Sequence, residues 1–236
     1  MKVGSNINAD RSNWSFGGKT AESFVEHAEL SIPFYHVGHD LISNISEFFV
    51  NKDSVCYDLG VSTGELIKKM AKQHKIKSEV VWKGIDIEKN MTLVAQESCK
   101  DFSNIEIIND NFILHDFEKS DFITSYYTMQ FVLPRSRQEV FNKVYDSLNW
   151  GGAFILFEKV RGSDARFQDM TSMIYTDFKM KNGFSPEEII NKALSLVGVM
   201  EPFSTQGNID MLKRAGFSDI NTIFKWCNFE GFIAIK

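Results

Sequence analysis

The chain has 236 residues, 43% hydrophobic and 24% charged, so it can bury a sizeable core and is expected to be globular. Its formal net charge of −5 disfavours a direct nucleic-acid partner, because proteins that depend on phosphate contacts are usually basic. No stretch reaches the roughly 18 apolar residues of a membrane span, and Met1–Arg11 lacks the apolar core of a signal peptide. Three scattered cysteines without a CxxC pair favour reduced thiols, so we expect a cytoplasmic protein with no membrane contact.

The N-terminal region precedes any strand-like run. Residues 1–13 are polar and are expected to form a loose terminus. Residues 14–50 are expected to be helical, because Glu22–Leu30 has helical spacing and Pro33 separates it from a second run, Val37–Phe49.

An alternation of strands and helices follows. Strands are predicted at Ser54–Leu59, Val80–Ile85, Ile105–Ile108, Asp121–Tyr127 and Ala153–Glu158, and helices at Glu65–His74, Glu88–Ser98 and Ser136–Leu148. Pro134 is expected to begin the last of these helices, and Trp150-Gly151-Gly152 to end it. Short connections between alternating strands and helices predict a parallel sheet that is covered on both faces.

The C-terminal part breaks this rhythm. Residues 163–200 are helical in pattern and rich in methionine and aromatic residues, which predicts an inserted cap. After a last helix at Ile209–Ala215, the runs Asn221–Cys227 and Gly231–Ile235 predict an antiparallel hairpin around residues 228–230. A seven-stranded, mostly parallel sheet finished by such a hairpin is the order of class I methyltransferases. We therefore expect a Rossmann-like α/β fold in a single domain, residues 1–236.

A glycine-containing loop, Asp58-Leu59-Gly60-Val61-Ser62-Thr63-Gly64, joins the first predicted strand to its helix. Gly60 and Gly64 allow a tight turn and a close approach of the backbone to a ligand at the carboxyl end of the strand. Asp58 fixes the loop or accepts a hydrogen bond from the amino group of a methionine moiety. Alone, the loop indicates only a nucleotide-type site, and a glycine turn without a ligand is the alternative.

Two further strand ends carry polar residues. Asp86 ends the next strand, 28 residues beyond Asp58, where a carboxylate can accept both ribose hydroxyls. NAD enzymes use an acid in the same place, so Asp86 does not distinguish the cofactors. After the third strand, Asn111 can meet the adenine amine and Phe112 can pack on the ring. Together with the closing hairpin, these residues favour S-adenosylmethionine (SAM), with S-adenosylhomocysteine as its product, over a nicotinamide cofactor.

The chain resembles the carboxy-S-adenosyl-L-methionine synthases from about Trp14 to Lys236. In that family, SAM and prephenate give the carboxylated cofactor that is used in wobble-uridine modification of tRNA. The matching pieces are Trp14-Ser-Phe16, Ser31-Ile-Pro-Phe-Tyr35, Tyr57-Asp-Leu-Gly60 with Ser62, Ile85-Asp86, Thr128-Met-Gln-Phe131, Leu148-Asn-Trp-Gly-Gly152, Glu158-Lys159, Asp177-Phe-Lys179, Asn182-Gly183, Ala215-Gly-Phe217 and Cys227-Asn-Phe229.

The resemblance implies a homodimer whose caps exchange contacts, and it also implies cofactor-binding positions. These are Tyr35, Gly60, Val61, Ser62, Asp86, Ile87, Asn111, Phe112 and Tyr126. Two of them depart from the family pattern: Asn111 stands where the family has Asp, and Tyr126 stands where it has Asn.

Ala193 is the departure with most consequence. The family has an arginine there, which binds the added carboxylate across the dimer interface, and neighbouring Lys192 lacks the bidentate fork of arginine. We therefore expect ordinary SAM and methyl transfer to a small-molecule acceptor. Carboxy-SAM synthesis is the alternative if Lys159, Arg161 or Arg166 supplies the cation, and a non-enzymatic SAM- or nucleoside-binding protein is a third reading.

No catalytic base, nucleophile motif or metal-ligand spacing identifies the chemistry further. Tyr127, Lys159 and Tyr175 are candidates for the acceptor pocket, with Lys159 suited to an anionic acceptor. Tyrosines in such positions are often core aromatics, and a lysine is often a surface residue. His115 is a loop histidine in preference to a general base.

Overall fold

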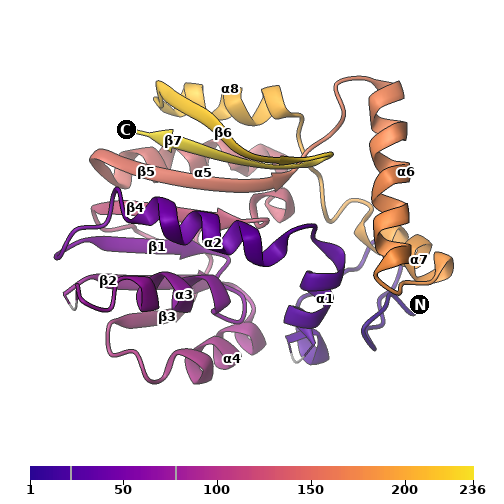
Figure 1. Cartoon of the computed structure of the whole chain (residues 1–236), viewed down its shortest axis with the longest axis horizontal. Helices are drawn as coiled ribbons and strands as arrows, with labels where there is room; N and C mark the ends of the chain where they lie inside the picture. The colour runs from indigo at the N-terminus through magenta and orange to yellow at the C-terminus, as the bar shows by residue number, and fades with distance from the viewer. Residues whose placement is uncertain (22, 78) are drawn as a thin grey trace.

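The computed structural model describes residues 1–21, 23–77 and 79–236. Seven strands form one sheet in the order β3-β2-β1-β4-β5-β7-β6. Strands β1 to β5 pair in parallel, whereas β7 runs antiparallel to both of its neighbours (Figure 1). The predicted class I methyltransferase-like sheet with its C-terminal hairpin is thus confirmed. The strands are β1 (Val55–Leu59), β2 (Val81–Asp86), β3 (Ile105–Asn109), β4 (Ser120–Tyr126), β5 (Leu148–Lys159), β6 (Asp219–Trp226) and β7 (Phe229–Ile235).

Helices cover both faces of the sheet. They are α1 (Phe24–Ser31), α2 (Tyr35–Ser46), α3 (Glu65–Gln73), α4 (Lys89–Cys99), α5 (Pro134–Ser147), α6 (Ala165–Lys181), α7 (Pro186–Leu196) and α8 (Thr205–Ala215), with short 3-10 turns at Gly18–Ala21 and Met129–Phe131. Helices α5 and α8 share one core cluster with the sheet, and α2 and α3 share the other. Glu22, where the first helix was expected to begin, lies outside the described residues. No helix in the described ranges is long and apolar enough to cross a membrane.

Strand β5 explains why the sheet is buried on both sides. Side chains alternate between faces along a strand, and here both sets are apolar. Phe154 and Leu156 join the cluster under α5 and α8, whereas Ile155 and Phe157 join the cluster under α2 and α3. All four are fully buried, so the continuous apolar run in the sequence reflects a central strand.

Two predicted boundaries are wrong. Helix α5 ends at Ser147 and β5 begins at Leu148, so Trp150-Gly151-Gly152 lies inside the strand instead of ending the helix. The pairing of β4 with β5 shifts register there, and Gly151, with φ of 81°, fits the irregularity. The hairpin turns at Cys227 and Asn228, because β7 already begins at Phe229.

The N-terminal segment, which we define as residues 1–16, is not a loose terminus. Val3, Ile7 and Trp14 are at most 6% exposed and form a small core of their own. The backbone N–H of Trp14 donates to Ser195 O at 3.1 Å, so the segment is tied to the end of α7 (Figure 1). The prediction of a loose terminus at residues 1–13 failed because their polar composition hides Val3 and Ile7, which pack with Trp14 and with residues far away in the sequence.

Candidate functional site

A cavity of about 800 Å³ lies at the carboxyl ends of the parallel strands, enclosed by the N-terminal segment, α1, α6 and α7. This is where α/β sheets bind ligands. Gly64 does not line it: a β-carbon there would lie 3.1 Å from Cys99 Sγ, so this glycine serves the packing of α3 on α4. The other predicted site residues all line the cavity, namely Tyr35, Asp58, Gly60, Val61, Ser62, Asp86, Ile87, Asn111, Phe112, Tyr126, Tyr127, Lys159 and Tyr175.

The loop after β1 is bonded to the end of β2. The backbone N–H groups of Gly60 and Val61 donate to Ile85 O at 2.8 and 3.0 Å. Gly60 has φ of 79°, and a β-carbon there would come within 2.3 Å of Thr128 Oγ1. Only glycine fits this left-handed, crowded position, so the loop backbone lies directly against the turn that follows β4.

Two carboxyl groups, the buried Asp58 and the partly buried Asp86, mark this end of the cavity. Asp58 is 2% exposed and accepts a hydrogen bond from Thr124 Oγ1 at 2.8 Å; burial raises its pKa to about 7. Asp86 accepts bonds from the backbone N–H groups of Ser62 and Glu88, both at 2.9 Å, and burial raises its pKa as well. These acids suit a ligand that brings positive charge and hydroxyl donors.

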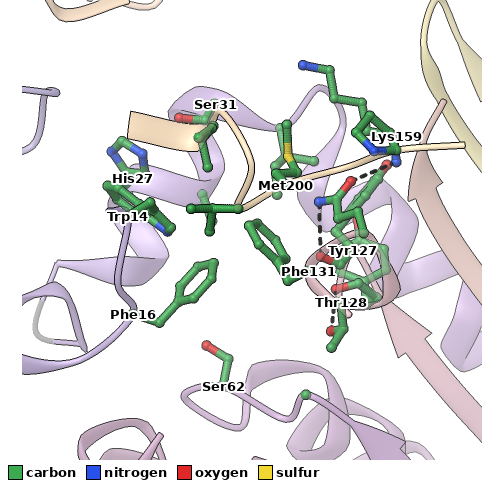
Figure 2. A pocket seen from close by; sticks show the side chains of 18 of the residues that line it. Trp14, Phe16, His27, Ser31, Ser62, Tyr127, Thr128, Phe131, Lys159 and Met200 are labelled. Atoms are coloured by element: carbon green, nitrogen blue, oxygen red, sulfur yellow. Dashed lines mark hydrogen bonds between the residues drawn. The ribbon is translucent and has the colours of Figure 1, made fainter. Parts of the chain in front are cut away.

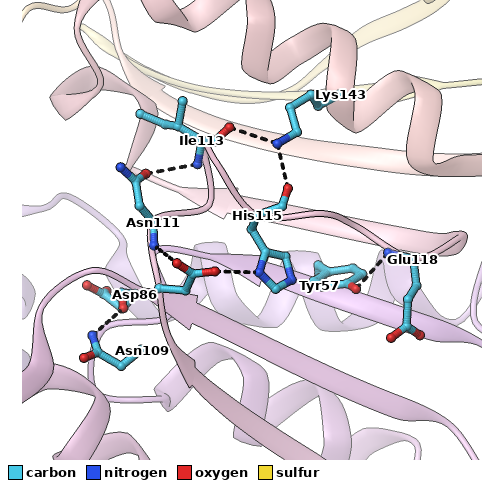
Figure 3. A network of polar contacts seen from close by, with 9 residues as sticks. Tyr57, Asp86, Asn109, Asn111, Ile113, His115, Glu118 and Lys143 are labelled. Carbon is cyan, nitrogen blue, oxygen red and sulfur yellow. Dashed lines mark hydrogen bonds and ion pairs between the residues drawn. The ribbon is translucent and has the colours of Figure 1, made fainter.

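The turn after β3 is held by its own side chains (Figure 3). Asn111 Oδ1 accepts from the backbone N–H of Ile113 at 3.0 Å, and Asp110 accepts from the backbone N–H of Asn111 at 2.7 Å. The imidazole of His115 bonds the other oxygen of Asp110 at 2.8 Å. His115 does not line the cavity, so the structure gives it a role in fixing this turn.

Tyrosines form the wall beside the loop. Tyr126 Oη donates to the backbone oxygen of Tyr35 at 2.7 Å, which ties β4 to α2. A β-carbon on Gly38 would lie 2.3 Å from this hydroxyl, so the helix approaches only because that residue is glycine. Tyr127 has a left-handed backbone with φ of 58°, and its buried hydroxyl bonds no partner in the described residues.

Positive charge gathers at the cap end of the cavity. Lys159 Nζ and Lys179 Nζ each lie 4.4 Å from the centroid of the Tyr175 ring, and Lys192 packs over the ring of Trp14. Burial, strengthened by repulsion from neighbouring cations, lowers the pKa of Lys159 to about 7; burial also lowers the pKa of Lys179 to about 8. Burial, together with the charge of Lys179, also lowers the pKa of Lys192 well below its ordinary value.

These ammonium groups lack a countercharge within the part of the chain that the structure describes. No carboxylate oxygen there lies within 4.0 Å of Lys159, Lys179 or Lys192. Cations that are crowded together away from water are costly unless an anion joins them. The cap end of the cavity is therefore arranged for an anionic ligand.

Several lining residues were not singled out as site candidates from the sequence: Trp14, His27, Thr128, Gln130, Lys179 and Lys192. Gln130 connects two predicted ones, because its side chain donates to Tyr127 O at 3.0 Å and accepts from the backbone N–H of Lys159 at 3.1 Å. A signal existed for Trp14, Thr128, Gln130 and Lys179, which fall within the matching pieces of the resemblance. Ala193 lies exposed at the edge of the cavity and brings no charge.

Known proteins are similar to this chain in sequence and in fold. A family model described as a methyltransferase domain matches residues 56–152. A carboxy-S-adenosyl-L-methionine synthase of Staphylococcus epidermidis is 41% identical over 98% of this chain and 100% of its own length. Among solved structures, an S-adenosylmethionine-dependent methyltransferase-like protein of Methanococcus maripaludis has a TM-score of 0.63 with 20% identity, over 97% of both chains. Human N-acetylserotonin methyltransferase in complex with SAM has a TM-score of 0.62 and 14% identity, over 92% of this chain and 55% of that one.

Proposed function

Because the chain belongs to the family of carboxy-S-adenosyl-L-methionine synthases, we propose that it transfers a carboxyl group from prephenate to the methyl carbon of SAM. The chain is a SAM-dependent transferase, and SAM is its cofactor. The reaction breaks the bond between the prephenate ring and its carboxyl group and forms a bond from that carboxyl carbon to the methyl carbon. The methyl carbon gives up a proton, the ring gives up its hydroxyl group, and phenylpyruvate and water remain.

One observation carries this proposal: lysines without a countercharge share a cavity with the cofactor loop. Lys159 and Lys179 face Tyr175 in the same cavity that Gly60 and Asp86 line. A neutral methyl acceptor would leave these cations unpaired in a half-buried place, whereas prephenate is a dianion. The charge at the cap end thus favours a carboxylate-bearing second substrate.

We assign the cofactor to the acidic end of the cavity. Asp86, already fixed by two backbone N–H groups, would accept the ribose hydroxyls, and Asn111 and Phe112 would hold the adenine. Asp58 would face the positively charged methionine part, because a buried carboxyl group gains most from a cation. Tyr35, Val61, Ser62, Ile87 and Tyr126 complete this half of the wall.

Methyl transfer to a small-molecule acceptor is the second candidate. The sequence favoured it because Ala193 cannot bind a carboxylate as the family arginine does. Lys159 lies in the cavity and can supply a cation in place of that arginine, so the alanine at position 193 is a weaker argument for methyl transfer. The observation that still favours methyl transfer is the absence of a bidentate guanidinium from position 193.

We further propose that the protein is a homodimer that pairs through α6. One face of this helix, with Ser172, Tyr175 and Lys179, lines the cavity. The opposite face is apolar and exposed: Met170, Met173 and Ile174 are 53%, 65% and 45% exposed. Covering such a face would remove apolar surface from water and hold the cap over the cavity.

The function is tested by incubating the purified protein with SAM and prephenate and analysing the nucleosides by mass spectrometry. We expect a product about 44 mass units heavier than SAM, the mass of CO₂. Lys159→Met should reduce its formation at least tenfold, whereas Lys213→Met, a change at an exposed lysine of α8, should not. Formation of S-adenosylhomocysteine with a methyl acceptor, and no heavier product, would decide for methyl transfer.

A further inference from the structure

The ring of Tyr175 contacts two of the lysines in the cavity. Lys159 Nζ and Lys179 Nζ each lie 4.4 Å from its centroid, so the two ammonium groups are at most twice that distance apart. Ring faces attract cations within about 6 Å of the centroid, and the attraction is strongest away from water. Because neither lysine has a carboxylate partner among the described residues, the Tyr175 ring stabilises the charged form of both.

Two separate elements meet at this ring. Tyr175 and Lys179 are four residues apart on α6, so their side chains lie on the same face of the helix. Lys159 is the last residue of β5 and comes from the sheet. The Tyr175 ring therefore determines how a lysine of the cap and a lysine of the sheet are placed relative to each other. The third lysine, Lys192 of α7, packs on Trp14 instead.

The ring itself is held in place by two contacts. Tyr175 Oη donates to the backbone oxygen of Ser31, at the end of α1, at 2.9 Å. Ser31 and Lys159 both line the cavity (Figure 2). The ring of Phe229 packs against Tyr175 with centroids 5.1 Å apart and an interplanar angle of 61°. Contacts from α1 and from β7 thus fix the orientation of the Tyr175 ring.

The hydroxyl group of Tyr175 is already occupied. A hydroxyl has one hydrogen to donate, and that of Tyr175 bonds Ser31. Burial raises the pKa of Tyr175, so the hydroxyl carries no negative charge that could pair with the lysines. Tyr175 lines the cavity, but it acts on the neighbouring ammonium groups through its ring.

We propose that Tyr175 is a positioning residue whose ring holds Lys159 and Lys179 together as one paired carboxylate site for the second substrate. The inference rests on the proposed function. In prephenate, the carboxylate and the carboxylate-bearing side chain are attached to the same ring carbon, so its two negative charges lie close together. Two cations gathered on one aromatic ring suit such a pair of charges, and Tyr175 keeps them in place without bonding the substrate itself.

The first test measures the affinity of prephenate by calorimetry, with S-adenosylhomocysteine present so that no reaction occurs. Tyr175→Leu removes the ring face and should weaken prephenate about tenfold or more, whereas Tyr175→Phe keeps the ring and should stay within about threefold of the wild type. Binding of S-adenosylhomocysteine should be unchanged in both variants, which shows that they are folded. Equal affinity of Tyr175→Leu and the wild type would overturn the proposal. An equal loss in both variants would overturn it too, because the hydroxyl would then account for the effect.

The pH dependence of prephenate affinity separates this role from a merely structural one. Burial and neighbouring cations lower the pKa of Lys159 to about 7, and burial lowers the pKa of Lys179 to about 8, so affinity for an anion is lost as the pH rises through these values. Without the ring face both pKa values should fall further, and in Tyr175→Leu the affinity should decline at a lower pH than in the wild type. Tyr175→Phe should keep the wild-type profile. A loss in Tyr175→Leu that is equal at every pH would refute the role of the ring.

Other charged and titratable groups lie near this ring and its lysines. They are Tyr127 after β4, Glu158 and Arg161 in and after β5, His27 of α1 and Lys192 of α7. Burial raises the pKa of Tyr127 and lowers the pKa of His27 to about 3, so both are neutral near pH 7. Glu158 titrates in the same range as the lysines, because burial raises its pKa to about 8. Both variants at Tyr175 keep all of these groups, so a difference between the two variants reports the ring.

The second test needs no substrate and separates this inference from the proposed function. Labelling with acetic anhydride over a range of pH, followed by mass spectrometry of the peptides, measures the pKa of Lys159 and of Lys179, because only the neutral amine reacts. Tyr175→Leu should lower both pKa values by about half a pH unit or more, while the exposed Lys213 of α8 should not change. Unchanged pKa values would overturn the role of the ring, whether or not the wild type makes the carboxylated product.

The two tests together distinguish the possible failures. If the wild type makes no carboxylated product, the proposed function fails, and the labelling alone decides whether the ring holds the lysines. If the product forms and the pKa values fall in Tyr175→Leu but prephenate affinity does not change, the ring has no part in substrate binding and the proposed function stands.

Discussion

At the scale of single residues, the acids and lysines whose pKa values shift most lie at different parts of the cavity wall. Asp58 and Asp86 lie at the end formed by β1 and β2, and Lys159, Lys179 and Lys192 lie at the end formed by the cap. Burial shifts the pKa of each of these groups toward its neutral form, upward for the acids and downward for the lysines. Charging them therefore costs free energy that two ligands of opposite charge would offset.

Asp58→Asn should stabilise the protein and impair cofactor binding. Burial raises the pKa of Asp58 to about 7 in the folded state, against about 4 in an unfolded chain. Between these values the folded state holds more protons, so stability falls as the pH rises from about 4 to about 7. Above pH 7 the substitution should restore at most about 4 kcal/mol, at about 1.4 kcal/mol per pKa unit. Thermal melts of the unliganded protein at pH 5 and pH 8 measure this effect.

The same variant should bind SAM at least tenfold more weakly, because the amide that replaces the carboxylate offers no negative charge to the methionine part. Calorimetry measures this loss, and Asp53→Asn, at an exposed position, is the control for both measurements. If the melting temperature of Asp58→Asn depends on pH in the same way as that of the wild type, ionisation of the Asp58 carboxyl group does not destabilise the folded state.

At the scale of elements, the N-terminal segment determines whether the cap end is closed. It contributes Val3, Trp14 and Phe16 to the cavity wall, and its small core packs on residues near the end of α7. The parallel strands and their loops form the cofactor half without it. The two halves of the cavity should therefore respond differently when the segment is loosened.

Ile7→Asp should loosen this segment, because it puts a charge at a position that is 6% exposed. We expect prephenate affinity to fall at least tenfold and S-adenosylhomocysteine affinity to change less than twofold. Proteolysis at Arg11 should become faster in the variant. Ile76→Asp, at a side chain that is 90% exposed, is the control. Equal proteolysis of Ile7→Asp and wild type would mean that the segment does not depend on this small core.

At the scale of the whole molecule, the helix α6 faces the cavity on one side and solvent on the other. Its 17 residues include no buried one, and Phe167, Met170, Met173 and Ile174 are all exposed. An apolar face of this kind is unusual on a monomer. Pairing of two copies would cover it and would fix the inner face, with Tyr175 and Lys179, over the substrate.

Met173→Glu should convert the proposed dimer into a monomer, because it buries a charge in an apolar interface. Light scattering after size-exclusion chromatography measures the mass, and Phe48→Glu, at a side chain that is 84% exposed away from the cap, is the control. Product formation should fall together with the dimer. A wild-type protein that is monomeric at all working concentrations would refute the dimer and leave the cavity assignment intact.

The sequence by itself determined the features that depend on neighbours along the chain. Alternating strands and helices, the left-handed Gly60 in the loop after β1, and polar residues at the ends of β2 and β3 are local patterns, and the structure has the sheet and these strand ends as predicted. Because the carboxyl ends of parallel strands meet at one edge, these local signals also located the end of the cavity to which we assign the cofactor.

Only the tertiary structure decided the other end. Trp14, His27 and Lys192 are distant in sequence. No local sequence pattern identifies a lysine that lacks a carboxylate partner in the folded chain. The polar N-terminal segment was expected to be loose because its apolar partners are long-range contacts. The same holds for position 193: its alanine indicated a lost carboxylate site, and the folded chain brings other cations into the cavity. Charge that gathers across distant segments is a property of packing, and for this reason the group of lysines that line the cavity is visible only in the fold, although the family resemblance already implied prephenate.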